Sequence, residues 1–364
     1  MILSEVRIHN FRNIASTSLI LNPNFNCITG PNGSGKTSLL EALYMLSCAH
    51  SFRSREVAPI ISYGQNQLNV FAHTYDESTI SVQKSITDGT QIKLNNQFCC
   101  TTSQLAYALP CQVIYSDIFQ IIDAGPSVRR SLLDWGLFHV KHDYLKIWKD
   151  YKRILSQRNA LLKSRATYEH FIPWDQQLSQ LANQLDKARN DYFLQWQPKF
   201  YQVLSDLTNI SCTIEYYKGW DRKNAGQNME ELLQKSFDSD KNKLYTQYGP
   251  HQADLIINIE QYRVKHTLSR GQQKIILIAL KLAQGQLLDK DCLYLIDDLA
   301  AELDDYHQRN LIKYLTQQKG QFVITNLINN NNYDILPIDS GLFEVNCGAI
   351  KKFYNIECFT WNTN

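Results

Sequence analysis

The sequence predicts an α/β protein in which a discontinuous head domain is interrupted by a helical arm. Residues 1–120 contain several short β-type runs and one strand–glycine loop–helix unit, whereas helical patterns dominate residues 121–244. From residue 245 to residue 364, strand and helix patterns alternate again. Because the chain is long enough for two cores, we expect 1–120 and 245–364 to form one head and 121–244 to form the arm.

Composition and charge argue against several classes of protein. The 364 residues carry a formal net charge of +2, so a nucleic-acid surface would have to be a local patch. The first residues, MILSEVRIHNFR, carry charges where a secretion signal needs an apolar core. No run of about 18 uncharged apolar residues is present to span a bilayer. The nine cysteines lack C-x-x-C spacing. We therefore expect a cytoplasmic protein with reduced thiols and no membrane partner.

Each expected element follows from its hydrophobic period. Alternating or short apolar runs bounded by turn residues predict strands at 5–11, 25–30, 69–75, 78–85, 90–96, 111–116, 253–259, 292–297 and 321–326. Helical spacing predicts helices at 127–138, 143–164, 174–207, 307–318 and in the stretch after Ser269. Leu178, Leu181 and Leu185 form one apolar stripe, which is too short for a long coiled coil.

The strand–loop–helix unit carries the strongest motif, Gly30-x-x-x-x-Gly35-Lys36-Thr37. Glycines allow backbone N–H groups to turn inward around phosphates, a lysine at this place reaches the β- and γ-phosphates, and the hydroxyl ligates Mg²⁺. The motif therefore predicts binding of ATP or GTP with Mg²⁺. The expected nucleotide-binding residues in this loop are Gly30, Asn32, Gly33, Ser34, Gly35, Lys36, Thr37 and Ser38.

A nucleotide site of this kind needs a carboxylate at the end of a neighbouring strand. The run CLYLIDDLAAELDD supplies Asp297 and Asp298 directly after four apolar residues. We expect Asp297, with Thr37, to hold Mg²⁺, and Asp298 to lie beside the attacking water. Lys36 and Asp298 are thus the expected catalytic residues.

A second candidate anion site stands just before this strand, in the stretch HTLSRGQQK. Ser269 occupies a helix N-cap position and Gly271 lies in the first turn, an arrangement suited to binding an anion. The order of phosphate loop, LSRGQQ, acidic strand and AELD resembles that of ABC-type ATPases. In those proteins the signature loop of one head covers the γ-phosphate bound by another head.

The resemblance is nearest to the RecF family of bacterial recombination and gap-repair proteins. It rests on NFRN, GPNGSGKTSLLEAL, SFR, GPSVRRSLLDWGLF, LSQRNALL, YGPHQADL, LSRGQQK and LYLIDDLAAELD, in this order along nearly the whole chain. The family implies an ABC-type, Rad50-like P-loop ATPase head with mixed sheets and a short helical arm. It also implies weak, DNA-dependent ATP hydrolysis that acts as a switch. The implied cofactors are ATP and Mg²⁺.

The family implies roles and partners at matching positions. Ser269, Gly271 and Gln272 would contact the γ-phosphate bound by a second copy, Asp304 would reach across that ATP-dependent homodimer, and Arg12 would lie near the nucleotide. The implied partners are gapped or junction DNA with double- and single-stranded parts, RecR and RecO, and indirectly the recombinase RecA.

The sequence departs from related patterns at several points. Arg270 replaces the usual glycine of transporter signature loops, and Gln252 replaces an expected arginine. The strand 321–326 ends at Thr325 and Asn326, without a switch histidine. A transporter-like subunit would need that histidine and a membrane-coupling surface. A small-molecule kinase would not need the signature loop. A structural chromosome protein, or a member that binds ATP without turnover, is compatible with Asp298 in place of glutamate.

A local excess of positive charge marks the start of the arm. The segment from Arg129 to Arg165 contains ten Lys or Arg residues but only three Asp or Glu residues. Such an excess is typical either of phosphate contacts or of a solvated helix face. The expected nucleic-acid residues are Arg129, Arg130, Lys149, Lys152, Arg153 and Arg158.

Overall fold

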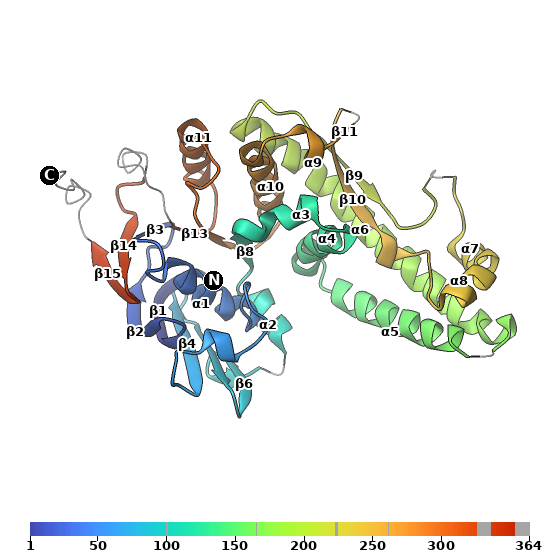
Figure 1. Cartoon of the computed structure of the whole chain (residues 1–364), viewed down its shortest axis with the longest axis horizontal. Coiled ribbons are helices and arrows are strands. Elements are labelled where there is room, and N and C mark those ends of the chain that lie inside the picture. The colour runs from blue at the N-terminus through green and yellow to red at the C-terminus, as the bar shows by residue number, and fades with distance from the viewer. Residues whose placement is uncertain (100, 165, 223–224, 261, 326–335, 354–364) are drawn as a thin grey trace.

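A computed structural model describes residues 1–99, 101–164, 166–222, 225–260, 262–325 and 336–353. Asn326 and the last residues of the expected head, 354–364, lie outside this part of the chain. Figure 1 shows a sheet-rich lobe from which a pair of long helices projects to one side. Among the described helices, none combines the length and apolar character that a bilayer span needs.

The first lobe is an antiparallel sheet with the strand order β2-β1-β4-β5-β6-β7. Its strands are β1 (Leu3–Phe11), β2 (Ile14–Ile20), β4 (Gln67–Thr74), β5 (Thr79–Ser85), β6 (Gly89–Leu94) and β7 (Gln97–Phe98). The short elements η1 (Ala58–Ile60) and α2 (Thr102–Ala108) accompany it. Alternation along the strands, interrupted by a register shift in β1, buries one face, including Val6, Ile8, Val70 and Val82, and leaves the other face mostly polar.

The second sheet positions the functional loops. Its order is β15-β14-β3-β13-β12-β8, with every neighbouring pair parallel except β14–β15. The strands are β3 (Phe25–Thr29), β8 (Cys111–Ile114), β12 (Leu293–Ile296), β13 (Gln321–Thr325), β14 (Gly341–Asn346) and β15 (Ala349–Phe353). Residues of β3, β12 and β13 are buried on both faces, which explains their nearly continuous apolar runs.

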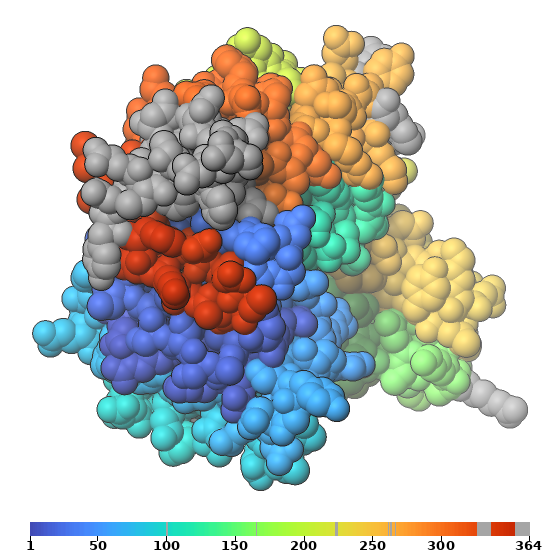
Figure 2. Space-filling view, turned by 60° about the vertical axis from the view of Figure 1, so that its left-hand side comes forward, coloured from blue at the N-terminus to red at the C-terminus, as the bar shows by residue number. Residues whose placement is uncertain are grey.

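The β14–β15 hairpin was not predicted. Asn346 pairs with Ala349, and the two residues between them, Cys347 and Gly348, both have positive φ values of 47° and 81°. This is the backbone that a two-residue hairpin turn requires, but Cys-Gly is a weaker sequence signal than Asn-Gly. In Figure 2 the hairpin (red) lies against the N-terminal strands (blue).

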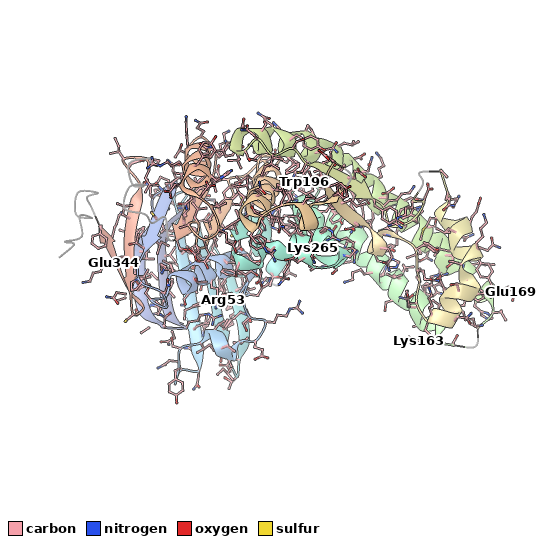
Figure 3. The ribbon with its side chains drawn as sticks, turned by 45° about the horizontal axis from the view of Figure 1, so that its top comes forward. Arg53, Lys163, Glu169, Trp196, Lys265 and Glu344 are labelled. Carbon is pink, nitrogen blue, oxygen red and sulfur yellow. The ribbon has the colours of Figure 1, made fainter. Side chains whose placement is uncertain are left out.

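The helical part begins after the short elements η2 (Ser116–Phe119) and α3 (Gln120–Asp123). Its helices are α4 (Pro126–Val140), α5 (Tyr144–Leu162), η3 (Tyr168–His170), α6 (Ile172–Leu207), α7 (Met229–Lys235) and α8 (Phe237–Lys243). A three-stranded sheet accompanies them, formed by β9 (Thr213–Tyr217), β10 (Asp254–Ile259) and β11 (Tyr262–Arg263). Helices α5 and α6 form the projecting pair, with Lys163 and Glu169 at its outer end (Figure 3).

Two apolar cores share the second sheet. One lies between the sheets around α1 (Lys36–Cys48) and contains Leu293 and Leu295 of β12. The other contains Tyr294 and Ile296 from the opposite face of β12. That core continues through α10 (Arg270–Gly285) and α11 (Asp305–Leu315) into α4, α5 and α6.

The arm helices therefore share their core with half of the head. Trp196 of α6 is fully buried and donates to the Leu280 carbonyl of α10 at 3.1 Å. Figure 3 shows Trp196 where the two helices meet. The remaining short elements, η4 (Pro250–Gln252) and α9 (Val264–Thr267), connect the arm to α10.

Candidate nucleotide-binding site

The glycine loop connects β3 to α1 with a backbone that only glycine adopts easily. Gly30 and Gly35 have φ values of 141° and 117°. A Cβ atom at Gly30 would lie 2.2 Å from the Val345 carbonyl oxygen of β14. A side chain at Gly30 would therefore displace the hairpin or the loop.

Two contacts that sequence reasoning missed hold this loop in place. The Asn13 side-chain amide donates to the Ser34 carbonyl at 2.9 Å, and the Gly348 amide donates to the same oxygen at 2.8 Å. Asn13 belongs to the NFRN motif and could have been singled out. Gly348 lies in the unpredicted hairpin and carried no signal in the sequence.

Lys36 begins α1 and is 6% exposed. Its ammonium group donates to the carbonyls of Gly30 at 2.7 Å and Pro31 at 2.9 Å. Burial lowers the pKa of Lys36, while the carboxylates of Asp297 and Asp298 act in the opposite direction. Since an ammonium group has three donors, one remains for an anion placed in the loop.

The acidic strand end lies beside the loop because β3, β13 and β12 are consecutive parallel strands of one sheet. The Thr37 hydroxyl donates to the Asp297 carboxylate at 2.9 Å, and the Thr325 hydroxyl donates to it at 2.7 Å. Thr325 also accepts a hydrogen bond from the Asp298 amide at 2.8 Å, and Asp298 has a φ of 48°. Hydroxyl and carboxylate oxygens are the ligands that Mg²⁺ prefers, so this pair fits the ion.

These groups open into one cleft of about 590 Å³. It is lined by Arg12, Asn13, Asn32, Gly33, Gly35, Lys36, Thr37, Ser38, Arg53, Asp297 and Asp298. Of the nucleotide-site residues predicted at Arg12, in the phosphate loop and at the end of the acidic strand, only Gly30 and Ser34 do not line this cleft. Arg12 is held there by the buried carboxylate of Glu41, to which it donates at 2.8 Å. Sequence reasoning missed both Glu41 and Arg53 as parts of this site.

The predicted signature loop, residues 268–273, caps α10 as expected. Ser269 accepts from the Gln272 amide at 3.3 Å, and the Gln272 side chain accepts from the Ser269 amide at 3.0 Å, which forms a capping box. Gly271 has a steric reason to be glycine, since a Cβ atom there would lie 2.4 Å from the Glu302 carbonyl oxygen.

The signature loop shares a hollow with the AELD segment, residues 301–304, which we call the D-loop. The hollow, of about 480 Å³, is lined by Ser269, Arg270, Gly271, Gln272, Glu302, Leu303, Asp304 and His307. Asp304 caps α11 and accepts from the His307 amide at 2.8 Å, which together with the His307 ring lowers the pKa of this carboxyl. Among the residues that the structure describes, none lines both this hollow and the nucleotide cleft.

Lys274 links the two predicted motifs and was not singled out from the sequence. It is 4% exposed and donates to the main-chain carbonyls of Asp298 at 3.1 Å and Ala301 at 2.5 Å. Burial lowers the pKa of Lys274, with Glu302, Asp298 and Asp297 opposing. Helix α10 is thereby tied to the segment that follows the acidic strand.

The predicted nucleic-acid patch is wrong for Arg158. Its side chain is 0% exposed and donates to Asp175 at 2.6 Å and to Asp240 at 2.8 Å, so it cannot reach a phosphate backbone. Helical spacing placed Arg158 on the inner face of α5, where acidic residues from distant segments surround it.

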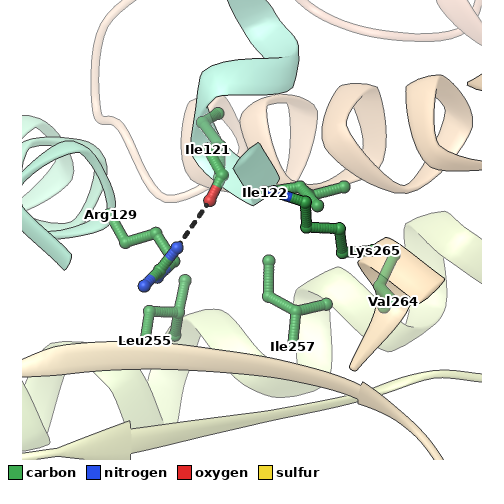
Figure 4. Close-up of a pocket in the computed structure, with 7 residues that line it drawn as sticks. All are labelled: Ile121, Ile122, Arg129, Leu255, Ile257, Val264 and Lys265. Carbon is green, nitrogen blue, oxygen red and sulfur yellow. Dashed lines mark hydrogen bonds between the residues drawn. The ribbon is translucent and has the colours of Figure 1, made fainter. Parts of the chain in front are cut away.

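Arg129 and Arg130 also point inward. Arg129 pairs with Asp254 at 2.6 Å, and Figure 4 shows it donating to the Ile121 carbonyl. Arg130 donates to the Ala253 carbonyl at 2.8 Å. Both arginines therefore connect α4 to the start of β10. Lys149, Lys152 and Arg153 are exposed on α5, where Lys152 lies over the Trp148 ring at 4.3 Å.

Comparison with known proteins identifies the class of protein to which this head belongs. Residues 2–335 match the family model described as the RecF/RecN/SMC N terminal domain, the ATPase head class of SMC-type proteins. The head of an Smc protein, solved with a domain of ScpA, shares the fold with a TM-score of 0.60 at 14% identity over 97% of both chains.

Within this class the chain belongs to the RecF family. It is 36% identical to the DNA replication and repair protein RecF of Francisella tularensis subsp. novicida, over 95% of this chain and 100% of that protein. It also superposes on a solved structure of the recombination mediator protein RecF-ATP with a TM-score of 0.83. That match has 26% identity and covers 97% of this chain and 98% of the other.

Replacing Thr37 with valine should remove the hydroxyl that faces Asp297 while keeping the shape of the side chain. We expect Thr37→Val to weaken Mg²⁺-dependent ATP binding by at least about tenfold, with little change in unfolding free energy. Titration calorimetry with ATP, with and without Mg²⁺, measures this. Thr316→Val removes an exposed hydroxyl on the far end of α11 and should bind like the parent. Equal Mg²⁺ dependence in both variants would contradict the assignment of Thr37.

Proposed function

We propose that the chain is an ATP-controlled DNA clamp of recombinational gap repair. The observation that carries this proposal is the separation of two half-sites within one chain. The phosphate loop, Asp297 and Asp298 line one cleft, whereas Ser269, Gly271, Gln272 and Asp304 line another hollow. A second copy of the chain would bring the hollow of one head over the cleft of the other, and the reciprocal pairing closes a symmetric dimer.

In this proposal ATP and Mg²⁺ act as a population switch. Lys36 and Thr37 bind the nucleotide in one head, and only the dimer adds the signature loop of the second head to its γ-phosphate. Asp298 positions the attacking water, and slow hydrolysis, stimulated by DNA, reopens the dimer. The solved RecF-ATP structure supports the choice of ATP over GTP.

The names of the relatives support a role at DNA. They describe RecF as a DNA replication and repair protein and as a recombination mediator in the RecFOR pathway. We propose gapped or junction DNA as the substrate of this chain, RecO and RecR as its partners, and assistance to RecA loading as the result. Three predicted contacts, Lys149, Lys152 and Arg153, retain exposed positions for the DNA backbone.

Sedimentation of the purified protein tests the clamp. We expect a monomer with ADP and a dimer with a non-hydrolysable ATP analogue, with gapped duplex DNA co-sedimenting only in the second case. A monomer in every condition would contradict the clamp. ATP-dependent phosphorylation of a small acceptor by that monomer would favour a kinase, and co-purification with membranes would favour a transporter-like subunit.

DNA binding by this clamp should depend on salt far more than on sequence. The sequence contains no motif for a helix that reads base edges in a DNA groove. Contacts should therefore be mainly to phosphates, whose counterions are released on binding. With three to five phosphate contacts, affinity should fall roughly 40- to 500-fold between about 50 and 200 mM salt. Fluorescence anisotropy with two unrelated gapped duplexes measures both effects. Equal binding at both salt concentrations would exclude this mode.

A further inference from the structure

A third cavity, of about 810 Å³, is lined by residues of both the head and helix α4. Its walls come from the segment after α1 (residues 50–55), the outermost strand β8, the turn that leads into α3, and helix α4. It is larger than the nucleotide cleft, and Arg53 is the lining residue that the two have in common. Figure 3 shows Arg53, one of its lining residues, where the sheet-rich lobe faces the rest of the molecule.

The charged groups of this cavity favour an anion. Arg53, Arg55 and Lys281 line it, against one carboxylate, Asp117. The nearest acid to Arg53 is Glu41, at 3.8 Å. Within the described part of the chain, neither Arg55 nor Lys281 forms an ion pair.

Lys281 brings a positive charge to the inner end of the cavity. Its ammonium group donates to the side-chain carbonyl of Gln112 at 3.0 Å. Burial lowers the pKa of Lys281 to about 8, and the acidic groups nearest to it are the thiols of Cys111 and Cys292. An anion in the cavity would supply the counter-charge that the protein does not provide.

The apolar lining of the cavity is aromatic. Tyr44, Phe52 and Tyr115 form an aromatic wall whose neighbouring rings meet at 76° and 53°, with centroids 5.5 Å and 4.7 Å apart. The Tyr115 hydroxyl donates to the Phe52 carbonyl at 3.0 Å, which fixes the ring in this wall. Trp135 lines the cavity from α4. Flat aromatic faces beside cationic side chains are the combination that binds a nucleotide through its base and its phosphate.

We propose that this cavity binds one nucleotide unit, with its terminal phosphate monoester at Arg53, Arg55 and Lys281 and its base against the aromatic wall. The volume lies within the range of pockets that bind small ligands, about 300–1,000 Å³. The same chemistry is offered by a free nucleoside phosphate and by the terminal nucleotide of a single DNA strand.

The walls of this cavity connect the two half-sites of the proposed clamp. Arg53 lines both the cavity and the nucleotide cleft. On the other side, α3 ends at Asp123, which pairs with Arg270 of the signature loop at 2.8 Å. A ligand in the cavity would therefore contact segments attached to the nucleotide cleft and to the signature loop.

The test uses the full chain carrying Lys36→Ala, which removes the phosphate-binding lysine from the nucleotide cleft. The probes are the dinucleotide pdTpdT, its form without the 5′-phosphate, and a 5′-phosphorylated 20-nucleotide strand. We expect calorimetry to show pdTpdT binding at least tenfold more tightly than the dephosphorylated form. A 4-thiothymine version should photo-crosslink to peptides that contain Phe52, Tyr115 or Trp135.

Arg55→Ala is the decisive variant because Arg55 is exposed and its removal should not affect folding. It should weaken pdTpdT binding at least tenfold, as should Lys281→Met. Arg222→Ala, which removes an exposed arginine outside the cavity, should bind like the parent. Tighter binding of the 20-nucleotide strand would identify a DNA end as the source of the ligand, and equal binding would identify a free nucleotide.

Two results would overturn the proposal. One is equal affinity for the phosphorylated and dephosphorylated dinucleotides, and the other is equal affinity in Arg55→Ala and Arg222→Ala. Because all these variants carry Lys36→Ala and none of the readouts requires dimerisation, failure here is separate from failure of the clamp.

Discussion

Ser269→Arg should abolish ATP-dependent dimerisation and leave ATP binding by the monomer unchanged. Ser269 is the N-cap of α10 and lines the hollow that would cover the γ-phosphate of a second head. An arginine there fills the hollow and removes the N-cap, whose loss alone costs about 1 kcal/mol. Within the described part of the chain, the nucleotide cleft and this hollow are lined by different residues, so the affinity for ATP should be retained.

Sedimentation with the non-hydrolysable analogue and calorimetry with ATP measure the two halves of this prediction. Ser205→Arg makes the same substitution at an exposed position of α6 and should dimerise like the parent. Normal dimerisation of Ser269→Arg would show that the signature loop does not act in a second head. Loss of ATP binding in that variant would show that both half-sites serve one chain.

Arg158→Met should destabilise the arm by about 3–5 kcal/mol, because it removes one partner of a buried ionic cluster. Arg158 donates to the carboxylates of Asp175 and Asp240 and to the Thr246 hydroxyl at 2.8 Å. Both acids are at most 1% exposed, so the variant leaves two buried carboxylates without their cation. Urea unfolding followed by circular dichroism measures the loss.

Arg153→Met on the same helix provides the matched control. Arg153 is 65% exposed and pairs with Asp150 at 3.0 Å, so its loss should cost less than about 1 kcal/mol. A similar cost for both variants would contradict the burial of Arg158. The comparison thus sets a buried structural arginine of α5 against a solvent-exposed one.

The cost of Arg158→Met should become smaller at low pH. Burial raises the pKa of Asp175 in the folded protein, and Arg158 is the main group that lowers it again. Without Arg158 the pKa of Asp175 in the folded protein rises further above its value in the unfolded chain, so folded Asp175 binds a proton more readily. As pH falls through the folded-state pKa of Asp175, protonation removes its buried negative charge. Above that pKa, the full stability loss of Arg158→Met is present.

Local patterns were sufficient for the parts of the site that lie within one segment. The glycine loop, Lys36, Thr37 and the Asp297–Asp298 pair follow from motifs whose spacing is set by a strand end and a helix start. The same holds for the capping box at Ser269 and Gln272. The long helices of the arm were also predictable, because their apolar residues recur at helical spacing over many turns.

Contacts between segments that are distant in the sequence could not be predicted from local sequence patterns. The β14–β15 hairpin supports the phosphate loop through Gly348, and Glu41 holds Arg12 at the nucleotide cleft. Lys274 ties α10 to the D-loop. In each case the partner lies far away in the sequence, and nothing in the spacing of either residue indicates the pairing.

The sequence by itself determined the family, the order of its motifs and which residues begin and end the functional loops, because these depend on local chemistry. Only the tertiary structure decided which arginines face solvent. Arg158 and Arg153 stand five residues apart on one helix, yet one is fully buried and the other 65% exposed. The difference arises because α6 and α8 bring Asp175 and Asp240 to one face of α5, so long-range packing separates a buried structural cation from a solvent-exposed one.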